Sequence, residues 1–258
     1  MQIIKLGGSV ITDKTKKQTF KKETMDKLAT QINKANKQMI IVHGAGSFGH
    51  VLAKEYKLNN GYKDDNQLLG FSKTHSMVQE LSSLVINSLN HHNIKAVAIP
   101  PHSVLTLKDH KPSIFDFKIF DSYLKHGFTP VTFGDVVLDE KLRFSICSGD
   151  LLIEILAKHF KPEKIVFAVD EDGIYTSNPK IDKNAKLIEK TTISDLEKLT
   201  IQADAHADVT GGMKGKINTI KNISKIGIST VIVNGNKPDR LYKVLVGEET
   251  TGTIVYGE

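Results

Sequence analysis

A glycine-rich segment that directly follows an apolar run is the feature that most constrains how this chain folds. Met39-Ile40-Ile41-Val42 predicts a buried parallel strand, and His43-Gly44-Ala45-Gly46-Ser47-Phe48-Gly49-His50 leads from it into a helical pattern. Glycines at a strand-to-helix turn let backbone N–H groups approach an anion, and the start of the helix adds partial positive charge. The segment therefore predicts an anion-binding turn at the edge of a parallel sheet.

A second glycine turn ends the first predicted strand. Lys5-Leu6-Gly7-Gly8-Ser9 places a lysine just before a glycine pair, so a cation and free backbone amides can face one site. Such N–H groups form anion-binding concavities. Two phosphate cradles in one small α/β chain indicate phosphoryl transfer from a nucleotide to an acceptor that already carries a phosphate.

Three further segments support this interpretation. Thr132-Phe133-Gly134-Asp135 puts another glycine turn after a strand, at the same sheet edge. Ser148-Gly149-Asp150 begins a helix, and the spacing leaves open whether Asp150 is a helix-capping residue or a charge that orients lysines of the site. The segment 208–216, Asp-Val-Thr-Gly-Gly-Met-Lys-Gly-Lys, combines three glycines and two lysines at a helix start, which suits a triphosphate.

Apolar runs alternate with helical patterns, as in successive βαβ units. Strands are predicted at 2–6, 38–43, 94–99, 129–133, 164–169 and 229–233, with a hairpin at 136–145. Helices are predicted at 23–36, 47–58, 67–91, 149–159, 193–200 and 214–226. The pattern predicts one continuous, mostly parallel sheet with helices on both faces. A seam near Lys161-Pro162-Glu163 separates an N-terminal lobe, 1–163, from a C-terminal lobe, 164–258.

Charge and composition exclude several classes. The net charge of +6 could indicate nucleic-acid binding, but only Arg143 and Arg240 among the 35 basic residues are arginine, the residue that best reads base edges. We expect no nucleic-acid partner. No apolar run approaches the roughly 18 residues of a membrane helix, so no membrane partner is expected either. With Ile3 and Ile4 already in a strand, no signal peptide is expected and the chain is predicted to be cytoplasmic.

The glycine motif alone is compatible with other enzymes, but its context argues against them. Gly44-Ala45-Gly46-Ser47-Phe48-Gly49 is a G-x-G-x-x-G, yet a dinucleotide-binding fold needs an acidic residue about 20 positions on, at the end of the next strand, and Asp64 and Asp65 lie in a polar loop. With Val51 the segment also matches the glycine loop of protein kinases, but no H-R-D or D-F-G motif accompanies it, and a Walker P-loop is absent. A nucleotide-sensing module without chemistry remains an alternative from a different class.

The positions of the histidines and of the single cysteine predict different roles for them. His50, one helical turn beyond the cradle, is predicted to face the bound group, and His43 at the strand end is predicted to be structural or to support the site. Cys147 excludes a disulfide within the chain and predicts a buried, small apolar residue. The other histidines show no ligand spacing; they are His75, His91, His92, His102, His110, His126, His159 and His206.

Taken in order, these segments resemble the amino acid kinase superfamily. Lys5-Leu6-Gly7-Gly8-Ser9 is similar to its opening nucleotide turn, and the segment 168–176, followed by Asn178-Pro179, is similar to its loop around the nucleoside. The segment 210–216 is similar to its phosphate loop. The resemblance implies a three-layer α/β/α sandwich, ATP as phosphoryl donor and a homodimer formed through the N-terminal lobe.

Within that superfamily the chain most resembles isopentenyl phosphate kinases. The residues that carry this resemblance are the segment 43–50, Lys14 after the first turn and the segment 130–135. It implies the reaction of ATP with isopentenyl phosphate to give isopentenyl diphosphate, a step of isoprenoid synthesis. Fosfomycin kinases share much of the pattern, including the histidine, and are the alternative within the superfamily.

The resemblance also implies a role for each site residue. The catalytic residues would be Lys5, Lys14, His50, Asp150 and Lys214. The ATP site would comprise Lys5, Gly7, Gly8, Ser9, Gly46, Asp170, Gly173, Tyr175, Gly211, Gly212, Lys214 and Lys216. The acceptor site would comprise Ala45, Gly46, Gly49, His50 and Gly134. Mg²⁺ would be held by ATP phosphates and water, with no metal ligand from the protein.

The five-carbon tail of that acceptor requires an apolar pocket. Part of the apolar stripe on the predicted helix 67–91 is expected to line it, although ordinary core packing explains most of these positions as well. The stripe consists of Leu68, Phe71, Met77, Val78, Leu81 and Val85.

Overall fold

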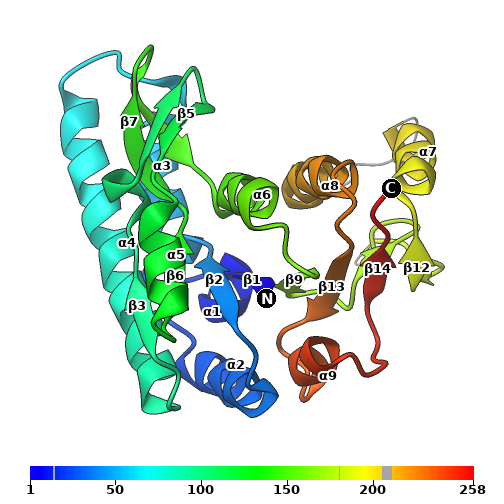
Figure 1. Ribbon diagram of the computed structural model, residues 1–258. Helices are drawn as coiled ribbons and strands as arrows, with labels where there is room; N and C mark the ends of the chain where they lie inside the picture. Colours follow the sequence, from blue (N-terminus) through cyan, green and yellow to red (C-terminus); the bar gives the residue numbers. More distant parts are fainter. Residues whose placement is uncertain (14, 180, 205–210) are drawn as a thin grey trace.

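The computed structural model has a central eight-stranded sheet (Figure 1). It describes residues 1–13, 15–179, 181–204 and 211–258, with side chains described outside 199–204 and 211–214. The strand order is β12-β14-β13-β9-β1-β2-β6-β3. The strands are β1 (Gln2–Leu6), β2 (Met39–His43), β3 (Ala96–Ala98), β6 (Thr129–Phe133), β9 (Ile165–Val169), β12 (Lys190–Thr191), β13 (Thr230–Asn234) and β14 (Thr253–Val255). All neighbours run parallel except β13 and β14.

Helices cover both faces of this sheet, which confirms the predicted three-layer α/β/α fold. One face packs against α5 (Lys118–Lys125), α6 (Gly149–Phe160), α7 (Ile193–Asp204) and α8 (Gly211–Ser224). The other packs against α1 (Gly8–Ile11), α2 (Lys22–Ala35), α3 (Gly46–Glu55), α4 (Asn66–His91) and α9 (Arg240–Val246). Figure 1 shows α6 and α8 side by side above the sheet and α2 and α9 below it.

The core is divided between the two faces of the sheet because successive side chains of a strand point to opposite faces. In β1, Ile3 packs into the core on the α6 side, whereas Ile4 and Leu6 pack into the core on the α2 side. All five β1 residues are buried, as expected for a strand covered on both faces. Only Lys5 breaks the apolar run with a charge, and it does so at the carboxyl end of the strand, where the glycine turns lie.

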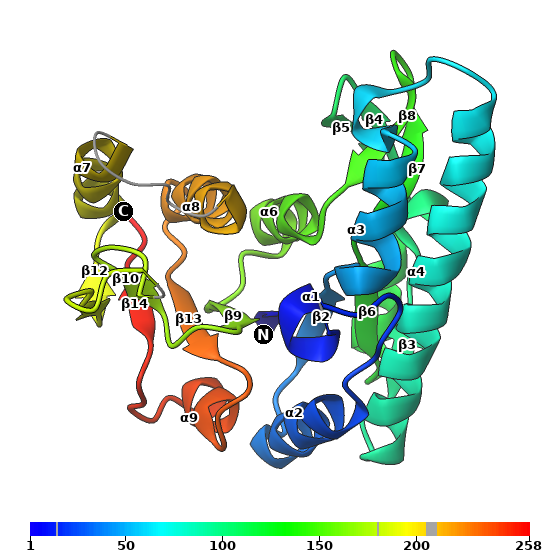
Figure 2. The same ribbon diagram turned by 180° about the vertical axis from the view of Figure 1, so that it is seen from behind.

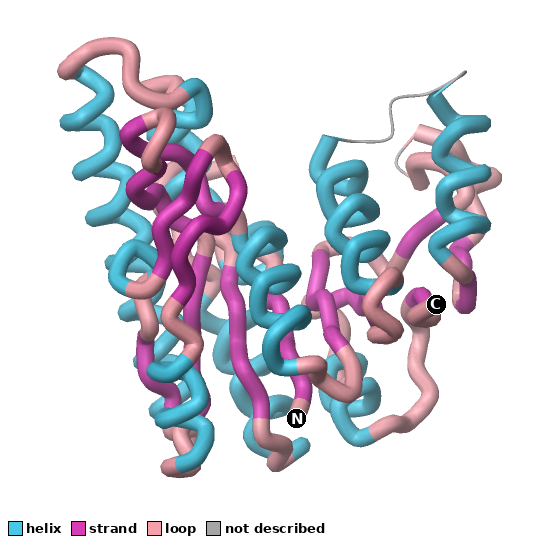
Figure 3. Tube along the Cα trace, turned by 45° about the horizontal axis from the view of Figure 1, so that its top comes forward, coloured by secondary structure: helices cyan, strands magenta, loops and turns pink. Residues whose placement is uncertain are grey.

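A second, four-stranded sheet lies beside α3 and the first turns of α4 (Figures 1 and 2). Its order is β5-β4-β7-β8, formed by β4 (Leu105–Lys108), β5 (Lys111–Phe115), β7 (Asp135–Asp139) and β8 (Arg143–Cys147). The hairpin of β7 and β8 was predicted, but β4 and β5 were not. The tube view in Figure 3 shows this sheet rising from the end of the main one.

Short elements complete the described chain. The 3-10 turns η1 (Leu58–Asn60) and η2 (Pro101–Ser103) flank α4 in sequence, and β10 (Ile174–Tyr175) pairs with β11 (Leu187–Ile188). The predicted helix 47–58 ends earlier, at Glu55, and the 3-10 turn η1 begins three residues later, at Leu58. The elements α1, α5, α9, β10, β11, β12 and β14 were not predicted. Cys147 is buried and unpaired by disulfide, as predicted.

The predicted boundary at 163/164 falls in the connection between α6 and β9, within one continuous sheet. β9 returns to the centre of the molecule and pairs with β1 from Ile3↔Ile165 to Leu6↔Ala168. In the described part of the chain, no helix has both the length and the apolarity required to cross a membrane.

Candidate active site

Two glycine turns stack backbone against backbone at the carboxyl ends of β1 and β2. A Cβ atom on Gly8 would lie 2.7 Å from the Cα and N atoms of Gly46, and one on Gly44 would lie 2.7 Å from the N atom of Gly8. Real Cβ atoms do not approach backbone this closely, so only glycine permits the contact. The turns predicted separately from sequence thus form one surface of main-chain groups at the starts of α1 and α3.

Gly46 is further constrained by its own backbone. Its φ angle is +51°, and a Cβ atom there would lie 2.2 Å from Oγ1 of Thr12. That hydroxyl donates to the carbonyl of Gly8 at 2.6 Å and accepts from the N–H of Ser47 at 3.0 Å. Thr12, which the sequence did not single out, therefore joins the two turns through a side chain that is fully buried.

Lys5 is the buried cation of the site. Its Nζ lies 2.5 Å from Oδ1 of Asp150, in the first turn of α6, and 5.6 Å from the centre of the Phe167 ring. Burial lowers the pKa of Lys5, the Asp150 carboxylate opposes that shift, and the charge of Lys216 adds to it. The helix cap is Ser148, whose hydroxyl accepts from the N–H of Leu151. The structure therefore places Asp150 against a lysine of the site and leaves capping to Ser148.

Gly134 and Gly149 bring β6 and α6 to the same edge. The N–H of Gly134 donates to the carbonyl of His43 at 3.1 Å, and a Cβ on Gly134 would lie 3.0 Å from the N atom of Gly149. A Cβ on Gly149 would lie 3.4 Å from Cε of Lys5. Three strand ends and three helix starts thus converge within contact distance, as is usual for ligand sites in open α/β sheets.

The two histidines that bracket the first cradle have opposite environments. His50 is exposed, on α3 one turn after its start at Gly46. His43 is fully buried, stacked on Phe133 at 5.0 Å, and burial lowers its pKa to about 4. His43 is thus a neutral core residue at physiological pH, in line with its predicted structural role. Gly49 is buried against α4, where a Cβ would lie 2.9 Å from Cγ2 of Val78.

The loop after β9 contributes a polar group of its own. Oγ of Ser9 donates to Oδ1 of Asp170 at 2.9 Å, which links the first glycine turn to this loop. Further on, Gly173 packs under β14, where a Cβ would lie 2.4 Å from Oγ1 of Thr253. Burial raises the pKa of the Tyr175 hydroxyl, and Asp172 and Glu171 raise it further. The structure therefore joins part of the predicted ATP set to the first turn.

An ion pair that the sequence analysis missed supports this loop. Nη1 of Arg240 lies 2.7 Å from Oδ1 of Asp172, which also accepts from Nδ2 of Asn234 at 2.8 Å. Burial opposes ionisation of Asp172, but these donors outweigh it and hold the pKa of that carboxyl below its usual value. Asn234 ends β13 and precedes Gly235, so a polar residue and a glycine after a strand were the signal available in the sequence.

Three of the remaining predicted residues, Gly211, Gly212 and Lys216, belong to α8. Gly211 and Gly212 begin that helix, and Lys216 lies close enough to Lys5 to affect its ionisation. Lys14 lies outside the described residues, as does the side chain of Lys214. Ala45 precedes α3 and is half-buried.

The apolar stripe of α4 divides between two clusters. Leu81 and Val85 are fully buried in the core against the main sheet, whereas Leu68 is 48% exposed. Phe71 instead packs against a small third cluster between α3, α4 and the second sheet. That cluster consists of Ala53, Leu58, Val136 and Phe144, with Ile146, Tyr56 and Tyr62 at its edge.

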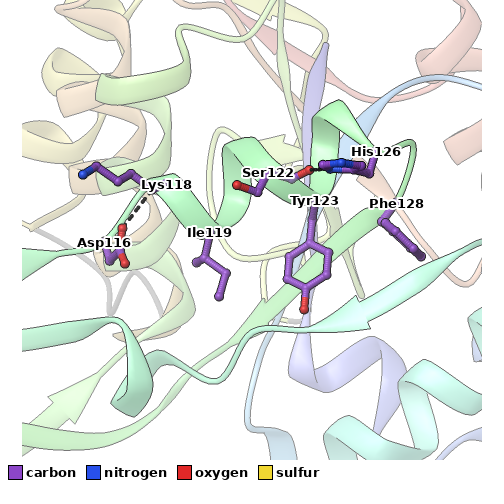
Figure 4. A pocket seen from close by; sticks show the side chains of 7 residues that line it. All are labelled: Asp116, Lys118, Ile119, Ser122, Tyr123, His126 and Phe128. Atoms are coloured by element: carbon purple, nitrogen blue, oxygen red, sulfur yellow. Dashed lines mark hydrogen bonds between the residues drawn. The ribbon is translucent and has the colours of Figure 1, made fainter.

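A separate hollow of about 450 Å³ lies on the outer surface of α5 (Figure 4). It is lined by Asp116, Lys118, Ile119, Ser122, Tyr123, His126 and Phe128. Figure 4 shows Asp116 accepting from the N–H of Lys118 and His126 turned back onto Ser122 rather than into the hollow. None of the predicted site residues that the structure describes lines it, so this hollow is separate from the glycine turns.

Comparison with known proteins decides the family. The model of the amino acid kinase family matches residues 1–234, and isopentenyl phosphate kinase of Methanothermobacter thermautotrophicus is 37% identical over the full length of both chains. The chain belongs to the amino acid kinase family, in its isopentenyl phosphate kinase branch. The predicted resemblance is therefore confirmed.

Two further matches agree with this assignment. Isopentenyl phosphate kinase of Methanocaldococcus jannaschii is 34% identical over the full length of both chains. A crystal structure of an isopentenyl phosphate kinase superposes with a TM-score of 0.87 at 34% identity and covers 99% of each chain. The chain therefore shares the fold of that kinase over nearly its whole length.

Proposed function

We propose that the chain transfers the γ-phosphoryl group of ATP to isopentenyl phosphate, giving ADP and isopentenyl diphosphate. The observation that carries the proposal is the pair of stacked glycine turns beside the ion pair of buried Lys5 with half-buried Asp150, in a chain of this family. The turn after β1 binds the phosphates of ATP, and the turn after β2 binds the phosphate of the acceptor. A phosphate oxygen of the acceptor attacks the γ-phosphorus while the bond from that phosphorus to the β–γ bridging oxygen breaks, and ADP leaves.

Repulsion between two anions is the main barrier to such a transfer, and fixed cations are the remedy. Lys5 is already buried and held by Asp150, so its charge needs no rearrangement when phosphate enters. An incoming phosphate replaces solvent beside the ammonium and raises its depressed pKa again. In this proposal Lys5, Lys214 and Lys216 lie along the β- and γ-phosphates, and Lys14 stabilises the transferring group.

The acceptor needs no general base because its phosphate oxygen is already anionic near pH 7. Catalysis is then positioning and charge stabilisation. His50 donates to the acceptor phosphate from the first turns of α3, with the main chain of Ala45, Gly46, Gly49 and Gly134 around it. Gly7, Gly8 and Ser9 contact the nucleotide phosphates, followed by Gly211 and Gly212, and Asp170, Gly173 and Tyr175 line the nucleoside.

Mg²⁺ is proposed as the companion of ATP. It prefers six oxygen ligands and keeps several waters, so phosphate oxygens and water supply most of its shell. The donor set fits this arrangement because Asp150 is engaged by Lys5 and Asp170 accepts from Ser9. When bound, the ion neutralises phosphate charge, and the protein cations position the groups that react.

The third hydrophobic cluster is the proposed destination of the isopentenyl tail. Ala53 belongs to it and lies on α3, one turn beyond His50. A phosphate held at His50 therefore directs its five-carbon tail between α3 and the second sheet. Phe71 is the member of the predicted stripe that packs against this cluster.

At the level of the whole chain, we propose that lobe 1–163 binds the acceptor and forms the homodimer, and that lobe 164–258 binds ATP. In the first lobe, Ile119 on α5 (38%) and Phe128 just after that helix (39%) are exposed apolar groups suited to a contact between copies. We also propose a cytoplasmic location, where ATP is supplied. Sedimentation velocity tests the dimer, because a chain of 28.5 kDa gives a well-separated monomer value.

A coupled assay of ADP release tests the function directly. Purified enzyme with ATP and Mg²⁺ is given isopentenyl phosphate, fosfomycin, UMP, acetylglutamate or carbamate in parallel. The proposal requires kcat/KM to be highest for isopentenyl phosphate. A higher value for fosfomycin would favour the other kinase of this pattern, and no ADP release with any acceptor would favour a nucleotide-sensing module.

A further inference from the structure

Three side chains from three different elements meet at one carboxylate oxygen. Nδ1 of His75, on α4, lies 2.7 Å from Oδ2 of Asp135, at the start of β7, and Nδ1 of His102, in η2, lies 3.9 Å from the same oxygen. The imidazole rings meet edge to face with their centres 4.4 Å apart. Figure 2 shows β7 alongside α4, the arrangement that brings these residues together.

Asp135 carries its carboxylate in a fully buried position, where a negative charge needs a positive partner. Its side chain has no exposed surface, and its other oxygen accepts from the N–H of Val136 at 2.8 Å. Among the residues that the structure describes, its ion-pair partners are the two histidines, and no lysine or arginine approaches it. A buried carboxylate is costly without a cation, so this position favours positive charge beside it.

The position of His102 is not explained by hydrogen bonding to the carboxylate. Its Nδ1 is beyond hydrogen-bond distance of Asp135, yet it faces the oxygen that His75 binds. The three donor atoms all lie within 4.8 Å of one another. Tetrahedral zinc with bonds of about 2.0–2.2 Å requires neighbouring donors roughly 3.3 Å apart. This value lies between the distances from Oδ2 of Asp135 to Nδ1 of His75, 2.7 Å, and to Nδ1 of His102, 3.9 Å.

We propose that His75, His102 and Asp135 form a binding site for a divalent transition-metal ion of the zinc class. Two imidazole nitrogens and one carboxylate oxygen are a donor set suited to zinc, whereas Mg²⁺ prefers oxygen alone. The side chains of His75 and His102 are 28% and 37% exposed, so water can complete the shell. The bound ion ties α4, η2 and the second sheet together. The site does not depend on the proposed kinase reaction.

Equilibrium zinc binding to the full-length, tag-free protein, without nucleotide, tests this proposal. A chromophoric chelator competes for Zn²⁺, and the wild type should take up one ion per chain at this site. His102→Ala removes an exposed ligand while leaving the contact of His75 with buried Asp135 intact. Since loss of even an outer-shell partner costs 10–100-fold in affinity, loss of a ligand should weaken binding by roughly 10-fold or more.

His126→Ala is the matched control, because it removes an exposed histidine that is not one of the three donors and precedes β6, whereas Asp135 follows that strand. It should bind zinc as the wild type does. Co²⁺ supplies a second readout, since its visible absorption should appear with wild type and His126→Ala and be lost with His102→Ala. Circular dichroism verifies that both variants are folded. Equal zinc affinity of His102→Ala and wild type, or no uptake by folded wild type, would overturn the proposal.

Discussion

His50 is the residue through which the proposed acceptor choice can be tested. A charge-assisted hydrogen bond to phosphate is worth roughly 1.5–3 kcal/mol, or about 10- to 150-fold. We expect His50→Ala to lower kcat/KM for isopentenyl phosphate by at least that factor, with ATP affinity nearly unchanged. His50→Gln, which keeps a donor, should recover part of the loss. Steady-state kinetics and nucleotide titration measure both quantities, and near-normal kcat/KM for His50→Ala would reject the assignment.

Lys5 and Asp150 act as a unit if the carboxylate serves only to hold the ammonium. Removing one fixed cation or donor from a transition state costs about 10²–10³ in kcat, so Lys5→Ala should lose that much. Asp150→Asn should lose roughly 10-fold or more because Lys5 is no longer positioned. The double variant should be no slower than Lys5→Ala alone. Fully additive losses in this cycle would show that Asp150 acts independently of Lys5.

At the scale of elements, the contact between the glycine turns makes a specific demand on Gly46. A Cβ there clashes with Thr12 and is also strained by the positive φ. Gly46→Ala should therefore destabilise the fold by about 2 kcal/mol or more and abolish phosphate binding. Gly127→Ala is the control: its φ is +79°, but nothing lies within 4 Å of its Cβ position.

This control separates the effect of a positive φ angle, which both glycines have, from the effect of close contact, which only Gly46 has. Gly127→Ala should cost about 1–2 kcal/mol of stability and leave kcat/KM unchanged. Urea unfolding and steady-state kinetics of the two variants measure the difference. If both variants behave alike in both measurements, close approach of the turns is not what requires glycine at position 46.

The second sheet depends on one buried carboxylate. Asp139 accepts from the N–H groups of Asp109, His110, Lys141 and Leu142 and from the hydroxyl of Ser145. Burial opposes its ionisation, but these donors outweigh burial and hold the pKa of Asp139 well below its usual value. Hydrogen bonds to a charged group contribute about 1.5–3 kcal/mol each, so Asp139→Ala should cost at least about 3 kcal/mol.

The contribution of Asp139 to the stability of the fold should fall at low pH. Because the folded-state pKa of Asp139 is lower than the unfolded value near 3.8, its contribution is fully present above that value and is lost as pH falls below it. Urea unfolding at pH 7 and in the acid range should show this loss for wild type and less of it for Asp139→Ala. Exposed Glu140→Ala should change stability by no more than about 0.5 kcal/mol. Equal effects of the two substitutions would contradict the account.

The same elements show what the sequence could predict. All strands of the main sheet except β12 and β14 were predicted, because they are apolar runs such as β9, which has five buried residues. The strand β5 has four exposed residues and contains Pro112, so its pairing with β4 rather than its own pattern makes it a strand. The helix α5 has only eight residues, and its buried Phe120 and Leu124 were too few to mark a helix.

For the whole molecule, the glycine turns were predictable because each lies directly after a strand, and parallel strands bring their carboxyl ends to one edge. The roles of side chains distant in sequence were not. His75 and Asp135 are 60 positions apart and meet only because β7 runs beside α4. Arg240 reaches Asp172 across 68 positions. No local pattern carries such contacts, which depend on how the layers pack.

The central claim is that one phosphate is transferred directly onto another. Identification of the product by ³¹P NMR, in a reaction of the wild type with ATP, Mg²⁺ and isopentenyl phosphate, tests it most directly. The account predicts an alkyl diphosphate, with two coupled phosphorus signals, formed in equal amount to ADP. Formation of ADP with inorganic phosphate and unchanged isopentenyl phosphate would contradict it.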